Sequence, residues 1–146
     1  MYLKDAAQGA LWEVRGGKTA QTHALHSYTR EFGKRMIVDH SREYRDARKV
    51  GEDVHVSVPK APDEVQQHDL MLLCLFHGAS FDCAYLSTEW ADHMADVANA
   101  KLEIATGQNR QVKSLARKYL PVLEQHLKMA EQDLMKTHYC GNGDDD

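Results

Sequence analysis

The sequence predicts an all-α protein built as a four-helix bundle, with a long crossover that contains a short extra helix. Two observations predict this fold class. Small and apolar residues recur at intervals of three and four over four long segments, which is the spacing of a helix face packed against its neighbours. The intervals between these segments are short, long and short, an order that joins two helical hairpins through a crossover.

The first hairpin consists of two long predicted helices. The first covers residues 3–24 and the second about residues 28–50, and Ser27 in the break between them is a suitable N-cap. Gly16 and Gly17 would each weaken an isolated helix by about 1 kcal/mol relative to alanine. We therefore expect these glycines to allow another helix to approach closely.

The crossover and the second hairpin follow. Residues 51–64 contain two of the three prolines and are predicted to be a long connection, which leads into a short apolar helix at about 65–77. The next helices are expected at about 80–106 and 109–138, with a kink or local break at Pro121. Such a crossover matches the ferritin-like variant of the four-helix bundle.

The composition fits one domain, predicted over residues 1–140, followed by a disordered acidic tail at 141–146. A chain of 146 residues with 42% hydrophobic residues can bury a sizeable core. The net charge of −4, with Lys and Arg spread along the chain, argues against nucleic acid as a partner. No apolar run reaches the roughly 18–20 residues of a membrane span, and no signal-peptide pattern is visible.

The three cysteines exclude some classes of site. Cys74, Cys83 and Cys140 form no C-x-x-C pair, so a zinc ribbon or a thioredoxin-like motif is excluded. An odd count leaves at least one thiol free or paired between chains. Cys74 and Cys83 lie among apolar residues, and we expect both to be small core side chains.

Nine histidines are a high count for this length. Each predicted helix face carries one residue near its middle that could bind a metal: Glu13, His40, His93 and His126. Counting from the turns places Glu13 level with His40, whereas His93 and His126 differ in height by about 7 Å. Three neutral imidazoles and one carboxylate suit Zn²⁺, and also Fe, Cu or Mn. The sequence therefore predicts a transition-metal site, with Zn, Fe or Cu as the ion.

Several neighbours could orient these ligands, because carboxylates and tyrosine hydroxyls often hold ligating imidazoles. They are Met36, Asp39, Tyr85, Glu89, Asp92 and Tyr119. A metal-free alternative stays open, since a bundle core tolerates a fully satisfied layer of Glu, His and Tyr hydrogen bonds. The remaining histidines are expected at the surface: His23, His26, His55, His68, His77 and His138.

Motifs in both halves resemble those of a known family. The chain has M-x-x-D-H at 36–40, F-D-x-x-Y at 81–85 and L-P-x-L-x-x-H at 120–126, in that order. This combination resembles a bacterial domain-of-unknown-function family whose members are often labelled "predicted outer membrane protein", over about residues 3–135. The resemblance implies a ferritin-like bundle in the periplasm or cell envelope, exported and then processed. A cytoplasmic location is the alternative.

Three functions remain open at this stage. The first is metal handling or stress tolerance through a core metal ion. Because no long predicted helix contains Glu-x-x-His, the sequence argues against a ferritin-type di-iron centre and favours a mononuclear site. The second is a non-catalytic envelope interaction or stress module, with a protein partner or homodimer and an exposed apolar patch around residues 70–76. The third is a metallo-oxidoreductase or hydrolase with an open coordination position.

Overall fold

The computed structural model of the chain describes residues 1–137 and residue 140. Within them lie four long helices and one short one, and no strand: α1 (Tyr2–His23), α2 (Ser27–Asp53), α3 (Glu64–Leu73), α4 (Ala79–Thr106) and α5 (Arg110–Lys136). The all-α prediction and the helix order are confirmed. The predicted tail at 141–146 and His138 lie outside the described residues.

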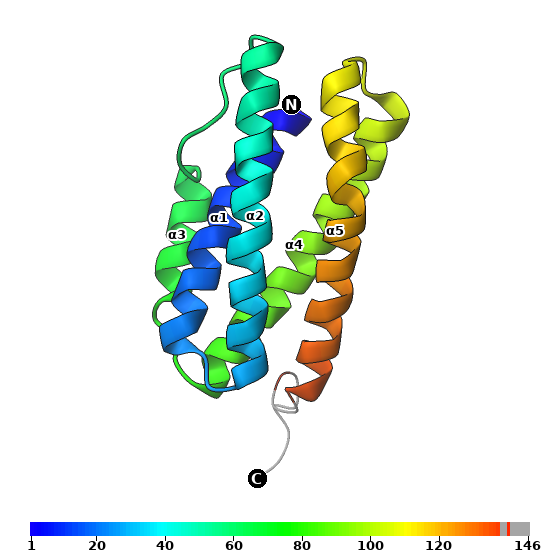
Figure 1. Cartoon of the computed structure of the whole chain (residues 1–146). Coiled ribbons are helices and arrows are strands. Elements are labelled where there is room, and N and C mark those ends of the chain that lie inside the picture. The colour runs from blue at the N-terminus through cyan, green and yellow to red at the C-terminus, as the bar shows by residue number, and fades with distance from the viewer. Residues whose placement is uncertain (138–139, 141–146) are drawn as a thin grey trace.

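Two antiparallel hairpins form the bundle. Figure 1 shows α1 paired with α2 and α4 paired with α5, while the crossover after α2 returns along the side of the first hairpin through α3. The two hairpins meet where α2 lies beside α5 and α1 beside α4, and α3 packs on the outside against α1 and α4. The four long helices therefore surround one common interior.

A pair of glycines sets the short distance between α1 and α2. A Cβ added at Gly17 would lie 2.5 Å from the carbonyl oxygen of Gly33, and one added at Gly33 would lie 2.9 Å from the Cβ of Ala20. Larger side chains would push α1 and α2 apart. The expected close approach is thus confirmed at Gly17, whose partner is a glycine of α2.

Local chemistry explains where the helices begin and end. Asp63 caps α3 by accepting from the backbone N–H of Gln66, whose side chain accepts in return from the backbone N–H of Asp63. Asn109 caps α5 with its side-chain oxygen, which accepts from the backbone N–H groups of Gln111 and Val112. The predicted helix at 65–77 is too long at its end, because the N–H groups of Leu75 and Phe76 donate three residues back instead of four.

Two other boundaries differ from prediction. The connection begins at residue 54 and not at 51, because α2 continues through Gly51, which is buried against Val58. Pro121 does not break α5. Its side chain is exposed, so water can solvate the carbonyl of Arg117 that a proline leaves without a hydrogen-bond donor.

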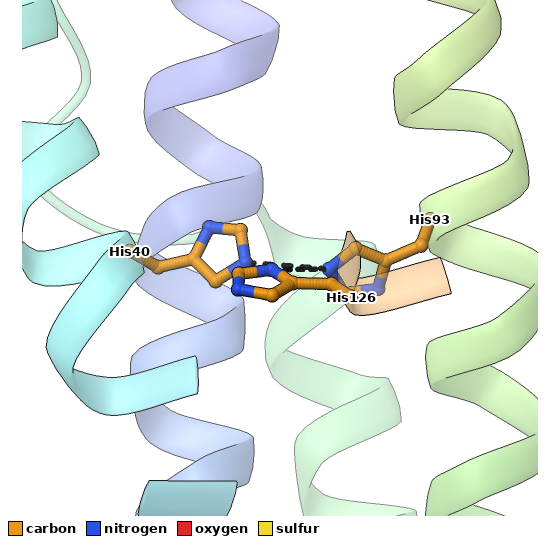
Figure 2. Close-up of side chains that lie close together, drawn as sticks. All are labelled: His40, His93 and His126. Carbon is orange, nitrogen blue, oxygen red and sulfur yellow. Dashed lines mark hydrogen bonds between the residues drawn. The ribbon is translucent and has the colours of Figure 1, made fainter. Parts of the chain in front are cut away.

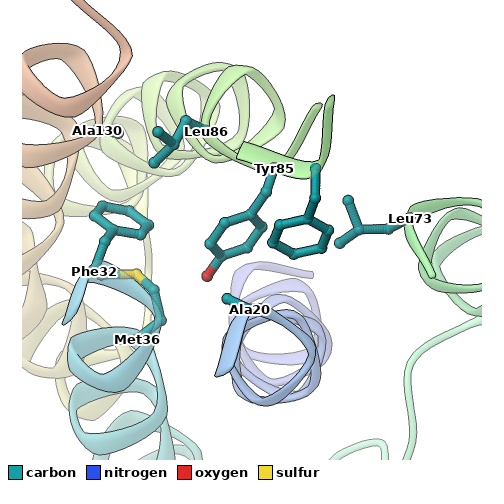
Figure 3. Close-up of a cluster of buried hydrophobic side chains, with 8 residues drawn as sticks. Ala20, Phe32, Met36, Leu73, Tyr85, Leu86 and Ala130 are labelled. Carbon is teal, nitrogen blue, oxygen red and sulfur yellow. The ribbon is translucent and has the colours of Figure 1, made fainter. Parts of the chain in front are cut away.

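Apolar clusters fill the two ends of the interior. One cluster, seen along the bundle in Figure 3, includes Phe32, Met36, Tyr85 and Leu86. A second, near the N-terminus of α1, contains Leu3, Ala7, Ala47, Leu115 and Tyr119. Between them the core is polar. This polar layer, defined by Glu13, His40, Glu89, His93 and His126, is at most 2% exposed at every residue.

The cysteines differ from expectation. Cys83 is not a free core thiol but forms a disulfide with Cys140, 57 residues away, which ties the chain beyond α5 to the first turns of α4. Cys74, also expected in the core, is a free and exposed thiol at the end of α3. In the described part of the chain, no helix is both long enough and apolar enough to cross a bilayer.

Candidate metal centre

Three imidazole rings from three helices meet in the polar layer. His40 comes from α2, His93 from α4 and His126 from α5, and Figure 2 shows their rings turned toward one another. His93 Nε2 lies 3.3 Å from His40 Nε2 and 3.3 Å from His126 Nδ1. These three nitrogens lie within 4.8 Å of one another, and all three residues are buried.

The height difference expected between His93 and His126 does not separate their rings. Counting from the observed helix ends, Thr106 and Arg110, reduces the offset to about three residues, or roughly 4.5 Å. The length of two facing imidazole side chains spans what remains. The turn of the second hairpin therefore accounts for about two of the five residues in the larger estimate.

A hydrogen-bond acceptor holds the outer nitrogen of each ring. His40 Nδ1 lies 2.7 Å from Glu43 Oε2, and His126 Nε2 lies 2.8 Å from Asp39 Oδ2. His93 Nδ1 lies 2.8 Å from the backbone oxygen of Glu89, one turn earlier. Because an ionised carboxylate and a backbone carbonyl oxygen only accept hydrogen bonds, the proton of each neutral ring lies on its outer nitrogen.

The inner nitrogens then present three lone pairs to one point. Facing lone pairs repel, so a buried cation or an added proton is needed between them. The 3.3 Å spacings match a metal site, since two ligands about 2.05 Å from a tetrahedral ion are roughly 3.3 Å apart. This arrangement of imidazoles with oriented outer nitrogens is typical of histidine metal ligands.

Electrostatics favours neutral rings at two of the three positions. Burial lowers the pKa of His93 well below its usual value, and the neighbouring His40 and His126 lower it further. Burial lowers the pKa of His126 to about 4, again assisted by His40. At His40 burial acts in the same direction, but the hydrogen bond and charge of Glu43 outweigh it and the pKa is raised. A competing proton would therefore reside on His40.

Glu13 lies elsewhere in the layer. Its Oε1 is 3.9 Å from His93 Nδ1, on the outer edge of that ring, where Glu89 Oε2 is 3.5 Å from the same nitrogen. Glu13, Glu89 and His93 thus make a second group of possible ligands that shares only His93 with the first. Burial, followed by the charge of Glu89, raises the pKa of Glu13 well above its usual value, and burial raises that of Glu89 to about 7.

Of the other predicted neighbours, one holds an imidazole of the cluster and three do not. Asp39 holds His126, although it precedes His40 in the sequence, and it also accepts from Arg35. Tyr119 donates to Asp46 and Met36 belongs to an apolar cluster. Asp92 is only partly buried.

Sequence reasoning missed two carboxylates. Glu43 and Asp96 lie three residues after His40 and His93, and this i,i+3 spacing on a helix was the signal that could have found them. Both line a cavity of about 190 Å³ beside the N-terminus of α1. Burial and the nearby charge of Glu43 raise the pKa of Asp96 to about 7. The cavity gives the outer side of His40 an acidic surface close to solvent.

The fold and this layer define a class: a helical bundle with three histidines clustered in its core. Residues 1–132 match the family model described as "Domain of unknown function (DUF4142)", and the chain belongs to that family. The expected membership of an uncharacterised domain family is confirmed. No curated protein and no solved structure matches the chain.

Proposed function

We propose that the protein binds one transition-metal ion through His40, His93 and His126, for metal handling or stress tolerance. The observation that carries this proposal is the convergence of three inner nitrogens whose outer nitrogens are each held by an acceptor. Three imidazoles favour Zn²⁺, and also suit Fe and Cu. The remaining coordination position would take water or a small anion.

Elemental analysis of protein purified without a histidine tag tests the proposal. We expect at least one transition-metal ion per chain in the wild type, and the loss of one ion in His40→Ala and in His126→Ala. His68→Ala, an exposed histidine on α3, is the matched control and keeps the metal. A wild type without metal, whose thermal unfolding is the same with Zn²⁺ and with EDTA, would contradict the proposal.

We also propose that the bundle is ferritin-like and that the protein acts in the cell envelope. The hairpin–crossover–hairpin order supports the first statement. The Cys83–Cys140 disulfide supports the second, because disulfides persist mainly in oxidising compartments. Cell fractionation with thiol labelling tests the location: we expect an oxidised pair in the envelope fraction, and a reduced pair in the cytosol is the contrary result.

An interaction module is the second candidate function, and one observation favours it. Met71, Leu72, Leu75 and Phe76 are between 43% and 76% exposed on and just after α3, as that hypothesis predicts for residues 70–76. Leu70 and Leu73 in the same stretch are buried. Sedimentation of the wild type and of Leu75→Ser tests it: a self-association that the substitution abolishes supports this function, and a wild-type monomer removes the homodimer form of it.

A further inference from the structure

The strongest unexplained feature outside the three-nitrogen cluster is a set of buried oxygens between α1 and α4. Glu13 Oε2, both carboxylate oxygens of Glu89 and the hydroxyl of Tyr85 have no hydrogen-bond partner outside their own group in the described part of the chain, where the two carboxyl groups and the hydroxyl lie close to one another. All three residues are at most 2% exposed. Buried polar atoms without partners are costly, and two carboxyl groups buried in one place need either a bound cation or a shared proton between them.

The geometry brings these oxygens toward one point. Ligand atoms of Glu13, Glu89 and His93 lie within 4.8 Å of one another. Tyr85 extends from α4 into the bundle interior and directs its hydroxyl between α1 and α2 (Figure 3). On the α1 side the residue is Gly16, and a Cβ placed there would lie 3.4 Å from the Tyr85 ring and 3.8 Å from Glu89 Oε1. These are ordinary van der Waals distances, so Gly16 lies directly beside the Tyr85 ring and the Glu89 carboxyl group.

Neighbouring groups in the protein do not neutralise this pair. The basic side-chain nitrogen beside them, His93 Nδ1, is 3.9 Å from Glu13 and 3.5 Å from Glu89, and it already faces the backbone oxygen of Glu89 at 2.8 Å. Each salt bridge of a Lys or Arg side chain in the described residues goes to another carboxylate. A divalent cation would balance two carboxylates and give the orphaned oxygens a partner.

We propose that Glu13 and Glu89, with the Tyr85 hydroxyl beside them, hold a second divalent cation of the oxygen-preferring kind, such as Mn²⁺ or Fe²⁺. His93 then stands between the two ions, with its inner nitrogen on the first and its outer edge toward the second. This centre departs from the mononuclear site that the sequence favours. The inference rests on the proposed function only for the ion at His40, His93 and His126. The second ion is held by other residues, Glu13 and Glu89.

Sequential loading separates the two sites. Metal-free protein is given one equivalent of Zn²⁺, which the imidazoles prefer, then Mn²⁺, and is desalted and analysed for both elements. We expect about one Zn²⁺ and one Mn²⁺ per chain, with the bound Mn²⁺ visible by electron paramagnetic resonance. In Glu13→Gln/Glu89→Gln we expect Zn²⁺ to stay and Mn²⁺ to fall at least tenfold.

Controls make the result decisive. Glu31→Gln/Glu131→Gln removes the same charge from exposed positions and should bind both ions like the wild type. Circular dichroism checks that each variant folds, and replacing unpartnered buried carboxylates by amides should not unfold the bundle.

Zn²⁺ without Mn²⁺ in the wild type, as expected if the carboxyl groups share a proton, overturns the second site but leaves the proposed function intact. Mn²⁺ retained in Glu13→Gln/Glu89→Gln also overturns it, whereas failure to bind Zn²⁺ counts against the proposed function.

Discussion

The metal-free protein should lose stability between pH 7.5 and pH 5 because of His126. This ring has a pKa of about 4 in the folded state and the ordinary value of 6.5 when unfolded, and burial is the main cause of the difference. Well above pH 6.5 the ring is neutral in both states, and its lowered pKa then costs no stability. Below pH 6.5 the unfolded state binds a proton that the folded state does not, so stability falls with pH.

The size of the effect follows from the two pKa values. At pH 5 the unfolded ring is almost fully charged and the folded ring is largely neutral, which costs about 2 kcal/mol of unfolding free energy, and at pH 7.5 the cost is close to zero. The full cost of about 3 kcal/mol is reached below pH 4. Other groups titrate over the same range, so the effect must be read as a difference between two proteins.

Urea unfolding of the wild type and of His126→Gln, both with EDTA, isolates the contribution of His126 to the pH dependence of stability. Glutamine keeps a donor for Asp39 and removes the titration. The loss of stability from pH 7.5 to pH 5 should be smaller in His126→Gln by about 2 kcal/mol, or about 1 M in the urea midpoint. His68→Gln, exposed on α3, should behave like the wild type. Equal pH dependence in His126→Gln and the wild type, within about 0.5 kcal/mol, would refute the assigned pKa and its burial argument.

Three further predictions follow from packing and bonding. Gly33→Ala should destabilise the protein by about 1–3 kcal/mol in thermal unfolding, because the new Cβ would lie 2.9 Å from the Cβ of Ala20. Gly9→Ala has open space around it and should be neutral or stabilising. Equal unfolding midpoints for the two variants would contradict the close contact between α1 and α2. Cys83→Ser should lower the unfolding free energy by about 2–4 kcal/mol relative to the oxidised wild type, because the disulfide closes a long loop. If mass spectrometry of the wild type finds no disulfide-linked Cys83–Cys140 peptide, the disulfide is excluded. Asp39→Asn should weaken metal binding about 10–100-fold in a competition titration, since Asp39 holds the outer nitrogen of His126, and unchanged affinity would show that this contact does not support the ligand.

Much of the fold was predictable because helix periodicity is a local property. The four long helices and the crossover follow from the spacing of apolar residues. Their ends were less predictable: Ser27, expected to be the N-cap of the second helix, is the first residue of α2, and His26 takes the cap position. The errors occurred where tertiary packing decides. Gly51 continues α2 because it is buried against Val58, and the pairing of Cys83 with Cys140 joins segments far apart in the sequence.

The candidate site was predictable in its residues and less so in its arrangement. The helix-face pattern placed His40, His93 and His126 inside the bundle, and all three are buried, whereas counting along the helices overestimated the difference in height between His93 and His126. It could not show that Glu13 lies on the outer edge of His93, because the rotation of each helix about its axis is set by side chains on all its neighbours. Asp39 illustrates the same limit, since it reaches across to His126 on α5.

The position of the polar layer between two apolar clusters has a consequence for how the helices align lengthwise. A shift of α5 by one turn, about 5.4 Å, would carry His126 toward Phe32 and Leu86 and leave Asp39 without its partner. Such a slip exchanges a buried hydrogen bond for a buried unpaired group and would cost several kcal/mol. The histidine layer therefore selects one longitudinal alignment of the helices among those that an apolar interior alone would tolerate.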